Sequence, residues 1–137
     1  MARIMALDCG TKRTGVAITD ELQLIASGLT TVETERLLSF LHNYTKMEQV
    51  ECLVIGKPKQ MDNSDSESEP FIQALIRQIS KEFPDLNIDR VDERFTSKMA
   101  FQTMIDSGLK KKKRQDKSLV DEISATLILQ NYLECKS

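Results

Sequence analysis

An aspartate near the start of the chain, Asp8, is the first residue whose type and position suggest chemistry. It ends an apolar run, residues 4–7, that is typical of a buried strand. A carboxylate there is costly to desolvate unless a cation, a metal or hydrogen-bond donors lie nearby. Gly10 and Gly15 bracket residues 11–14, which predicts a tight hairpin that brings hydroxyls and cations near Asp8, with glycines available for positive φ. The alternative, a hairpin in which the aspartate is only a cap, stays open.

Two further carboxylates lie at positions suited to the same site. Glu93 closely follows residues 86–91, which alternate in polarity as a strand does. Asp121 lies on a predicted helix, and Ser124 and Ala125, three and four positions on, are small enough for that face to approach a sheet. Ser118 precedes Asp121 by three residues, the spacing of a helix-capping pair, so spacing alone leaves a capping role equally open.

A basic block separates the last two predicted helices. Its cations are Lys110, Lys111, Lys112, Lys113, Arg114 and Lys117, against one acidic residue, Asp116, in a chain of net charge −2. Taken alone, such a block is more typical of a solvated loop than of a specific contact.

Periodicity predicts the elements that carry these residues. The chain is predicted to begin with three antiparallel strands, the third over 24–32, followed by a helix from Thr34 and a strand over 51–56. A helix from Pro70 to Pro84 and a strand over 86–91 come next. Two helices end the chain, one capped by Thr96 or Ser97 and ended by Gly108, the other over about 118–133. A long polar loop, residues 57–69, precedes the second helix. Right-handed crossovers would place the last two strands parallel to the first, so that Asp8 and Glu93 end at one edge, where open α/β sheets bind ligands.

Composition indicates an ordinary globular chain. With 137 residues, of which 40% are hydrophobic and 29% charged, we expect a single domain over 1–137. No apolar run approaches the roughly 18 residues of a membrane-spanning helix and no signal peptide is recognisable, so we expect a cytoplasmic protein without a membrane partner. Cys9, Cys52 and Cys135 are expected to be buried, reduced thiols. His42, the only histidine, is expected to be a surface or boundary residue rather than a metal ligand.

Four motifs in order along the chain resemble one family. They are residues 7–17 (LDCGTKRTGVA), residues 54–58 (VIGKP) followed by Met61-Asp62, residues 92–97 (DERFTS), and Val120-Asp121 with Ser124-Ala125. The sequence resembles the YqgF family, also called RuvX, of RNase H-like proteins described as Holliday junction resolvases and pre-16S rRNA nucleases.

The resemblance implies an α/β, RNase H-like fold: a five-stranded mixed sheet, with a three-strand antiparallel meander plus two parallel strands, and helices on both faces. It implies an endonuclease in which Asp8, Glu93 and Asp121 are catalytic and hold Mg²⁺ or Mn²⁺. Its partner would be nucleic acid, structured RNA such as the 5′ end of pre-16S rRNA or branched DNA, bound by a monomer or weak homodimer. The residues assigned to phosphate contacts are Thr11, Lys12, Arg13 and Arg94. The basic block, with Lys110, Lys111, Lys112, Lys113 and Arg114, is expected to contact phosphates because of its charge and its place next to the Asp121 helix.

The chain departs from the wider superfamily of junction resolvases at two places. Those proteins carry a glutamate on the fourth strand, where this chain has Ile55-Gly56, and a second helical aspartate where it has Ser124. We expect Glu93 to compensate rather than Glu122, which lies about 100° around the helix from Asp121. Whether one or two metal ions bind stays open.

Two other classes of function compete with a nuclease. Asp8, Gly10 and Thr11 also resemble the phosphate loop of actin-like phosphotransferases, but those enzymes clamp nucleotide between two related domains and this chain is the length of one. A non-catalytic nucleic-acid-binding module is the other alternative. Three clustered carboxylates argue against it, because a binder of polyanions gains nothing from negative charge without a metal.

Overall fold

The protein is built on a five-stranded sheet in the order β3-β2-β1-β4-β5. The computed structural model describes residues 2–57, 68–92 and 117–136. β1 (Arg3–Cys9), β2 (Arg13–Thr19) and β3 (Ala26–Glu33) form an antiparallel meander. β4 (Val50–Lys57) and β5 (Asn87–Asp92) are parallel to β1. The carboxyl ends of β1, β4 and β5 therefore lie at one edge of the sheet, as the right-handed crossovers predicted.

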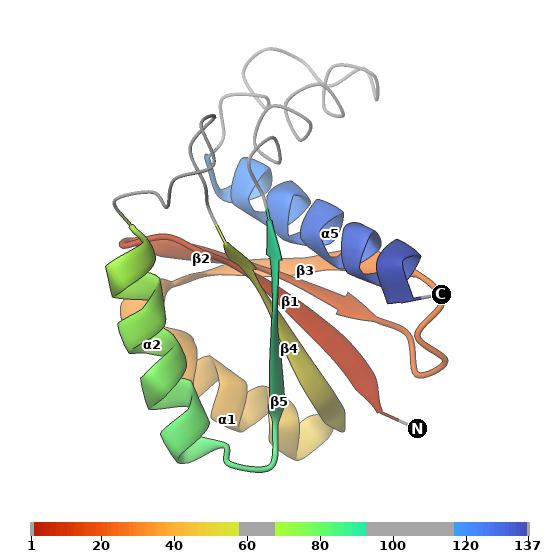
Figure 1. The fold of residues 1–137 in the computed structure, drawn as a ribbon, viewed down its shortest axis with the longest axis horizontal. Coiled ribbons are helices and arrows are strands. Elements are labelled where there is room, and N and C mark those ends of the chain that lie inside the picture. The colour runs from red at the N-terminus through yellow and green to blue at the C-terminus, as the bar shows by residue number, and fades with distance from the viewer. Residues whose placement is uncertain (1, 58–67, 93–116, 137) are drawn as a thin grey trace.

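Helices cover both faces of this sheet (Figure 1). On one face lie α1 (Leu37–Met47), entered through the short η1 (Thr34–Arg36), and α2 (Glu69–Glu82); α5 (Lys117–Lys136) crosses the other. Each face has its own apolar core because strand side chains alternate: Met5 and Leu7 of β1 pack on the α1/α2 side, and Ile4 and Ala6 on the α5 side. Within the described ranges, no helix is long and apolar enough to span a membrane.

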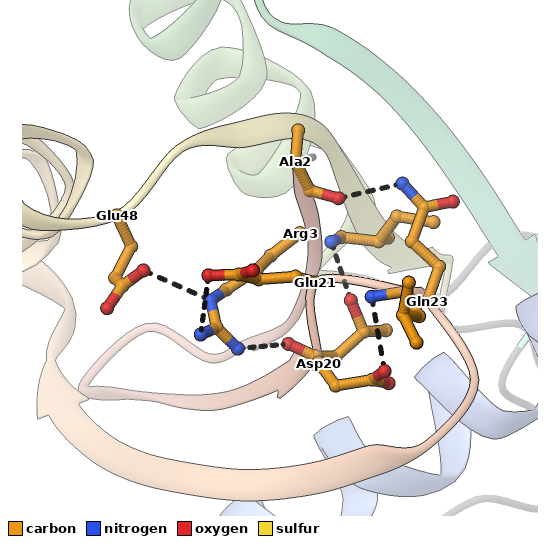
Figure 2. Close-up of polar contacts among 9 residues, drawn as sticks. Ala2, Arg3, Asp20, Glu21, Gln23 and Glu48 are labelled. Atoms are coloured by element: carbon orange, nitrogen blue, oxygen red, sulfur yellow. Dashed lines mark hydrogen bonds and ion pairs between the residues drawn. The ribbon is translucent and has the colours of Figure 1, made fainter.

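The third strand begins at Ala26, two residues later than the sequence predicted. The carboxylate of Asp20 accepts hydrogen bonds from the backbone N–H groups of Leu22, Leu24 and Ile25, at 3.1, 2.8 and 2.8 Å. Gln23 inside this turn has φ 60°, and its amide donates to the carbonyl of Ala2. Figure 2 shows the turn, with Arg3 reaching from β1 toward Glu48. The apolar residues 24 and 25 therefore belong to a capped turn rather than to the strand.

The predicted hairpin joins β1 to β2, and neither bracketing glycine uses the left-handed φ that was open to it. The Gly10 N–H donates to the Arg13 carbonyl at 2.9 Å. Thr34 ties the turn to the start of η1: its hydroxyl donates to the Gly10 carbonyl at 2.6 Å and its N–H to the Lys12 carbonyl at 2.9 Å. The loop tip is thus held in one place beside the end of β1.

Other predictions have mixed outcomes. Cys9 and Cys52 are buried thiols, but Cys135 near the end of α5 is exposed, so the expectation for it was wrong. His42 is exposed beside Glu82 and Phe83, as predicted for a surface histidine. The predicted helix between residue 96 and Gly108 lies outside the described residues.

Candidate active site

Asp8 faces the side of the sheet that α5 covers. Ile4 and Ala6, two and four positions earlier on β1, are fully buried in the core beneath α5. Because side chains alternate along a strand, Asp8 continues this face toward the carboxyl end of β1, where it is half-buried. Its cross-strand partner in the antiparallel register is Gly15 of β2. Paired residues of adjacent strands share a face, so the absent side chain of Gly15 leaves space next to Asp8.

The backbone of α5 occupies that space at Asp121. A Cβ atom on Gly15 would lie 1.9 Å from the carbonyl oxygen of Asp121 and 3.0 Å from the backbone nitrogen of Glu122. The helix therefore rests directly on β2 at the one residue without a side chain. Sequence reasoning assigned Gly15 to the hairpin turn and missed this role. The apposition brings Asp121 to β2, the strand that pairs with β1 at Asp8.

An ion pair joins the hairpin to α5 at this point. Arg13, the first residue of β2, donates through Nε to Oδ2 of Asp121 at 3.0 Å. Both side chains are partly exposed, 37% for Arg13 and 24% for Asp121. Thr11 and Lys12 are exposed at the hairpin tip. Arg13 was assigned to substrate phosphate; in this structure its guanidinium instead neutralises one of the predicted metal-binding carboxylates.

The neighbours of Asp121 on α5 differ in their surroundings. Ser124, one turn on, is 1% exposed, and its Oγ has no hydrogen-bond partner among the described residues. Glu122 extends over β3, because a Cβ on Gly28 would lie 2.8 Å from Cγ of Glu122. β3 is separated from β1 by β2. This placement agrees with the expectation that Glu122 does not replace the missing helical aspartate.

A second arginine–carboxylate pair fixes the carboxyl end of β4. Arg90 on β5 donates to both oxygens of Glu69, from Nη2 at 2.7 Å and from Nη1 at 3.1 Å. It also donates to the backbone carbonyls of Ile55 and Gly56, each at 3.1 Å. The Arg90 hydrogen bond holds the pKa of Glu69 below its ordinary value, although burial opposes this. The pair anchors the start of α2 to the edge of the sheet at which β1 ends after Asp8. No local sequence pattern indicates that Glu69 and Arg90 pair.

Of the three predicted ligand carboxylates, the structure describes Asp8 and Asp121, and it places the Asp121 backbone against Gly15, the cross-strand partner of Asp8. Glu93, Arg94 and the basic block from Lys110 to Arg114 lie outside the described ranges, so their placement stays a prediction. In the parts of the chain that the structure describes, no three histidine, cysteine, aspartate or glutamate residues form a group that could hold a metal. The two carboxylates are nevertheless the hard oxygen donors that Mg²⁺ and Mn²⁺ prefer.

Solved structures with the same architecture include two resolvases. The fowlpox virus resolvase, crystallised with Holliday junction DNA, matches with a TM-score of 0.59 at 13% identity, over 98% of each chain. Thermus thermophilus RuvC, also in complex with a Holliday junction substrate, matches with a TM-score of 0.57 at 14% identity, over 99% of this chain and 96% of that one. At these identities the likeness concerns the fold, and it confirms the predicted RNase H-like architecture.

Relatives in sequence are much closer. A Christiangramia forsetii protein named "Putative pre-16S rRNA nuclease" is 64% identical over 97% of this chain and 98% of its own length. Proteins of the same name from Bacteroides fragilis and Porphyromonas gingivalis are 57% and 50% identical, over 99% and 98% of this chain. The family model described as "RuvX: Holliday junction resolvase" matches residues 2–135, and the chain therefore belongs to the RuvX family.

Proposed function

We propose that this protein is a divalent-metal-dependent endonuclease that hydrolyses phosphodiester bonds in precursor 16S rRNA. The observation that carries the proposal is the seating of Asp121 on Gly15, which brings a carboxylate from α5 to the strand next to Asp8. Relatives that share half or more of its residues are named as pre-16S rRNA nucleases. The RNA substrate rests on those names, and the hydrolytic site on the geometry.

The donor set suits a hard divalent cation. Asp8 and Asp121 present carboxylate oxygens from a rigid strand and a rigid helix, and we assign Glu93, the residue after the end of β5, as a third donor from the sequence. Clustered carboxylates would repel a polyanionic substrate, so their charge is useful only when a cation offsets it. The chemistry that one or two Mg²⁺ or Mn²⁺ ions supply when bound is activation of a water molecule and stabilisation of the departing 3′ oxygen.

The remaining assigned residues position the substrate. Thr11 and Lys12 are exposed at the hairpin tip, where Thr34 fixes the backbone. A hydroxyl and an ammonium at a fixed turn can hold a phosphate beside Asp8. We assign Arg94 and the basic block from Lys110 to Arg114 to further phosphate contacts on sequence grounds.

The test is cleavage of a pre-16S rRNA fragment by the wild-type protein and by Asp8→Asn. The substitution keeps the size of the side chain and removes the charge that a metal requires, so we expect near-total loss of Mg²⁺- or Mn²⁺-dependent cleavage. Asp85→Asn is the matched control, since Asp85 is an exposed aspartate between α2 and β5, at the opposite end of β5. Its cleavage rate should equal that of the wild type.

Combining Asp8→Asn with Asp121→Asn should add little to the single loss, because residues that act as one catalytic unit are strongly non-additive. Circular dichroism and thermal melting establish that the variants are folded. Cleavage that survives in Asp8→Asn, with contaminating nuclease excluded by a mock purification, would reject the assigned site. RNA binding without any cleavage by the wild type would favour a non-catalytic module.

Branched DNA is the second candidate substrate, because the family model is described by Holliday junction resolution. A four-way DNA junction and the rRNA fragment should be compared at equal concentration, metal and salt. We expect faster cleavage of the RNA. Preferential, symmetric nicking of the junction would reassign the substrate while leaving the metal site in place.

A further inference from the structure

Among the described residues, two arginine–carboxylate pairs that join a strand to a helix at this edge of the sheet differ in character. In the pair of Arg90 with Glu69, the guanidinium bonds both carboxylate oxygens and two backbone carbonyls, and the glutamate side chain is only 3% exposed. In the pair of Arg13 with Asp121, a single hydrogen bond joins Nε to Oδ2, and both side chains reach solvent. The first is a fixed structural link, whereas the second is held weakly enough to exchange.

The position of the Arg13–Asp121 pair indicates what a change of ion-pair partner would do. Asp121 is an assigned metal ligand, and its carboxylate cannot give its full charge to a metal ion and to a guanidinium at once. Arg13 lies two residues before Gly15 on β2, on the same face, so it flanks the point where α5 rests on the sheet. Arg13 also directly follows Thr11 and Lys12 of the hairpin tip, where we place the substrate phosphate.

We infer that Arg13 is an exchangeable counter-ion of Asp121. Arg13 neutralises the Asp121 carboxylate through the hydrogen bond from Nε to Oδ2. Were a divalent cation to be held by that carboxylate, the Arg13 guanidinium would be released to contact a phosphate of the substrate. The inference rests on the proposed nuclease function and adds a coupling between metal and substrate. Arg13 opposes metal binding in the absence of RNA and favours RNA binding once the metal is present.

Thermodynamic linkage makes this coupling measurable in both directions. If Mn²⁺ frees Arg13 for phosphate, then Mn²⁺ raises the affinity for RNA, and RNA raises the affinity for Mn²⁺ by the same factor. Removing the guanidinium should therefore raise Mn²⁺ affinity in the free protein and lower RNA affinity in the presence of Mn²⁺. A purely structural role for Arg13 would lower both affinities.

The experiment measures Mn²⁺ binding to the RNA-free protein by titration calorimetry, for the wild type, Arg13→Gln and a matched control. Arg77→Gln is that control, because Arg77 is an exposed arginine of α2, on the face of the sheet opposite α5. We expect Arg13→Gln to bind Mn²⁺ about two- to fivefold more tightly, as the loss of a partly exposed ion pair predicts. Arg77→Gln should match the wild type, and the Mn²⁺ affinity of Arg13→Lys should lie between those of the wild type and Arg13→Gln.

Affinity for the rRNA fragment is then measured in chelator and in Mn²⁺, at low temperature, with intact RNA verified on a gel. Arg13→Gln should lose most of the gain in affinity that Mn²⁺ gives the wild type. Mn²⁺ binding by Arg13→Gln that is equal to or weaker than in the wild type would overturn the inference. If Asp121→Asn binds Mn²⁺ as tightly as the wild type, the proposed metal site fails as well, so the two failures are distinguishable.

Discussion

Gly15→Ala tests the contact on which the site depends. The added Cβ would lie 1.9 Å from the carbonyl oxygen of Asp121, 2.3 Å from its carbonyl carbon and 3.0 Å from the nitrogen of Glu122. Since ordinary van der Waals contact begins near 3.4 Å, α5 would have to retreat by about 1.5 Å at Asp121. All three neighbours are backbone atoms of one helix, so no side chain can rotate to relieve the overlap.

The expected cost follows from this geometry. Alanine in a strand interior is ordinarily about 0.5–1 kcal/mol more favourable than glycine, so without the overlap the variant would be more stable. Overpacking a well-packed core costs about 1–3 kcal/mol, and we expect a decrease of about 3 kcal/mol in the free energy of unfolding because the obstacle is rigid. A displacement of roughly 1 Å at a reacting group costs about 100-fold in rate, which sets the expected decrease in cleavage.

The assays are urea denaturation and single-turnover cleavage of the rRNA fragment. Gly28→Ala is the matched control, because its Cβ would meet the side chain of Glu122, at 2.5 Å from Oε1, and that side chain can turn away. We expect the unfolding free energy and the cleavage rate of Gly28→Ala to equal those of the wild type. Wild-type stability and cleavage in Gly15→Ala would refute the conclusion that the α5 backbone rests on β2 at this residue.

Two further predictions concern charge. Glu69→Gln should lose about 2–3 kcal/mol of stability at pH 7, less than the roughly 3–5 kcal/mol of a fully buried pair because Arg90 is 25% exposed. The hydrogen bond from Arg90 lowers the pKa of Glu69, so the extra unfolding free energy of the wild type over Glu69→Gln should be complete above pH 4.5 and should disappear as the pH falls through the lowered pKa. Denaturation at several pH values measures this difference. Equal stability of the two proteins at pH 7 would contradict the prediction. The last prediction concerns the four consecutive lysines Lys110, Lys111, Lys112 and Lys113. Their neutralisation should weaken RNA binding and reduce the slope of log affinity against log salt concentration by about 0.7–0.9 for each phosphate no longer neutralised. An unchanged slope would indicate that this segment is only a solvated connector.

The order of the described elements, and the edge of the sheet where the strand carrying Asp8 ends, could be predicted from the sequence alone. Strand and helix periodicity are local properties, so β1, β4, β5 and the helices between them could be predicted to within a few residues. The handedness of crossovers then indicated which strands are parallel to β1. Asp8 is a candidate from the sequence alone because a carboxylate at the end of a buried strand is unusual in any context.

How the helix meets the sheet, and which charges pair, depended on the tertiary structure. Gly15 has the same sequence signal whether it bends a hairpin or receives a helix, and the approach of α5 distinguishes the two. Arg13 and Asp121 are 108 positions apart, and Glu69 and Arg90 are 21 apart on different elements, so no local pattern pairs them. Even the start of β3 depended on the side chain of Asp20 competing for the backbone N–H groups of residues 22–25. Propensity and periodicity describe one segment at a time, whereas packing and ion pairing depend on distances that exist only once the segments have come together.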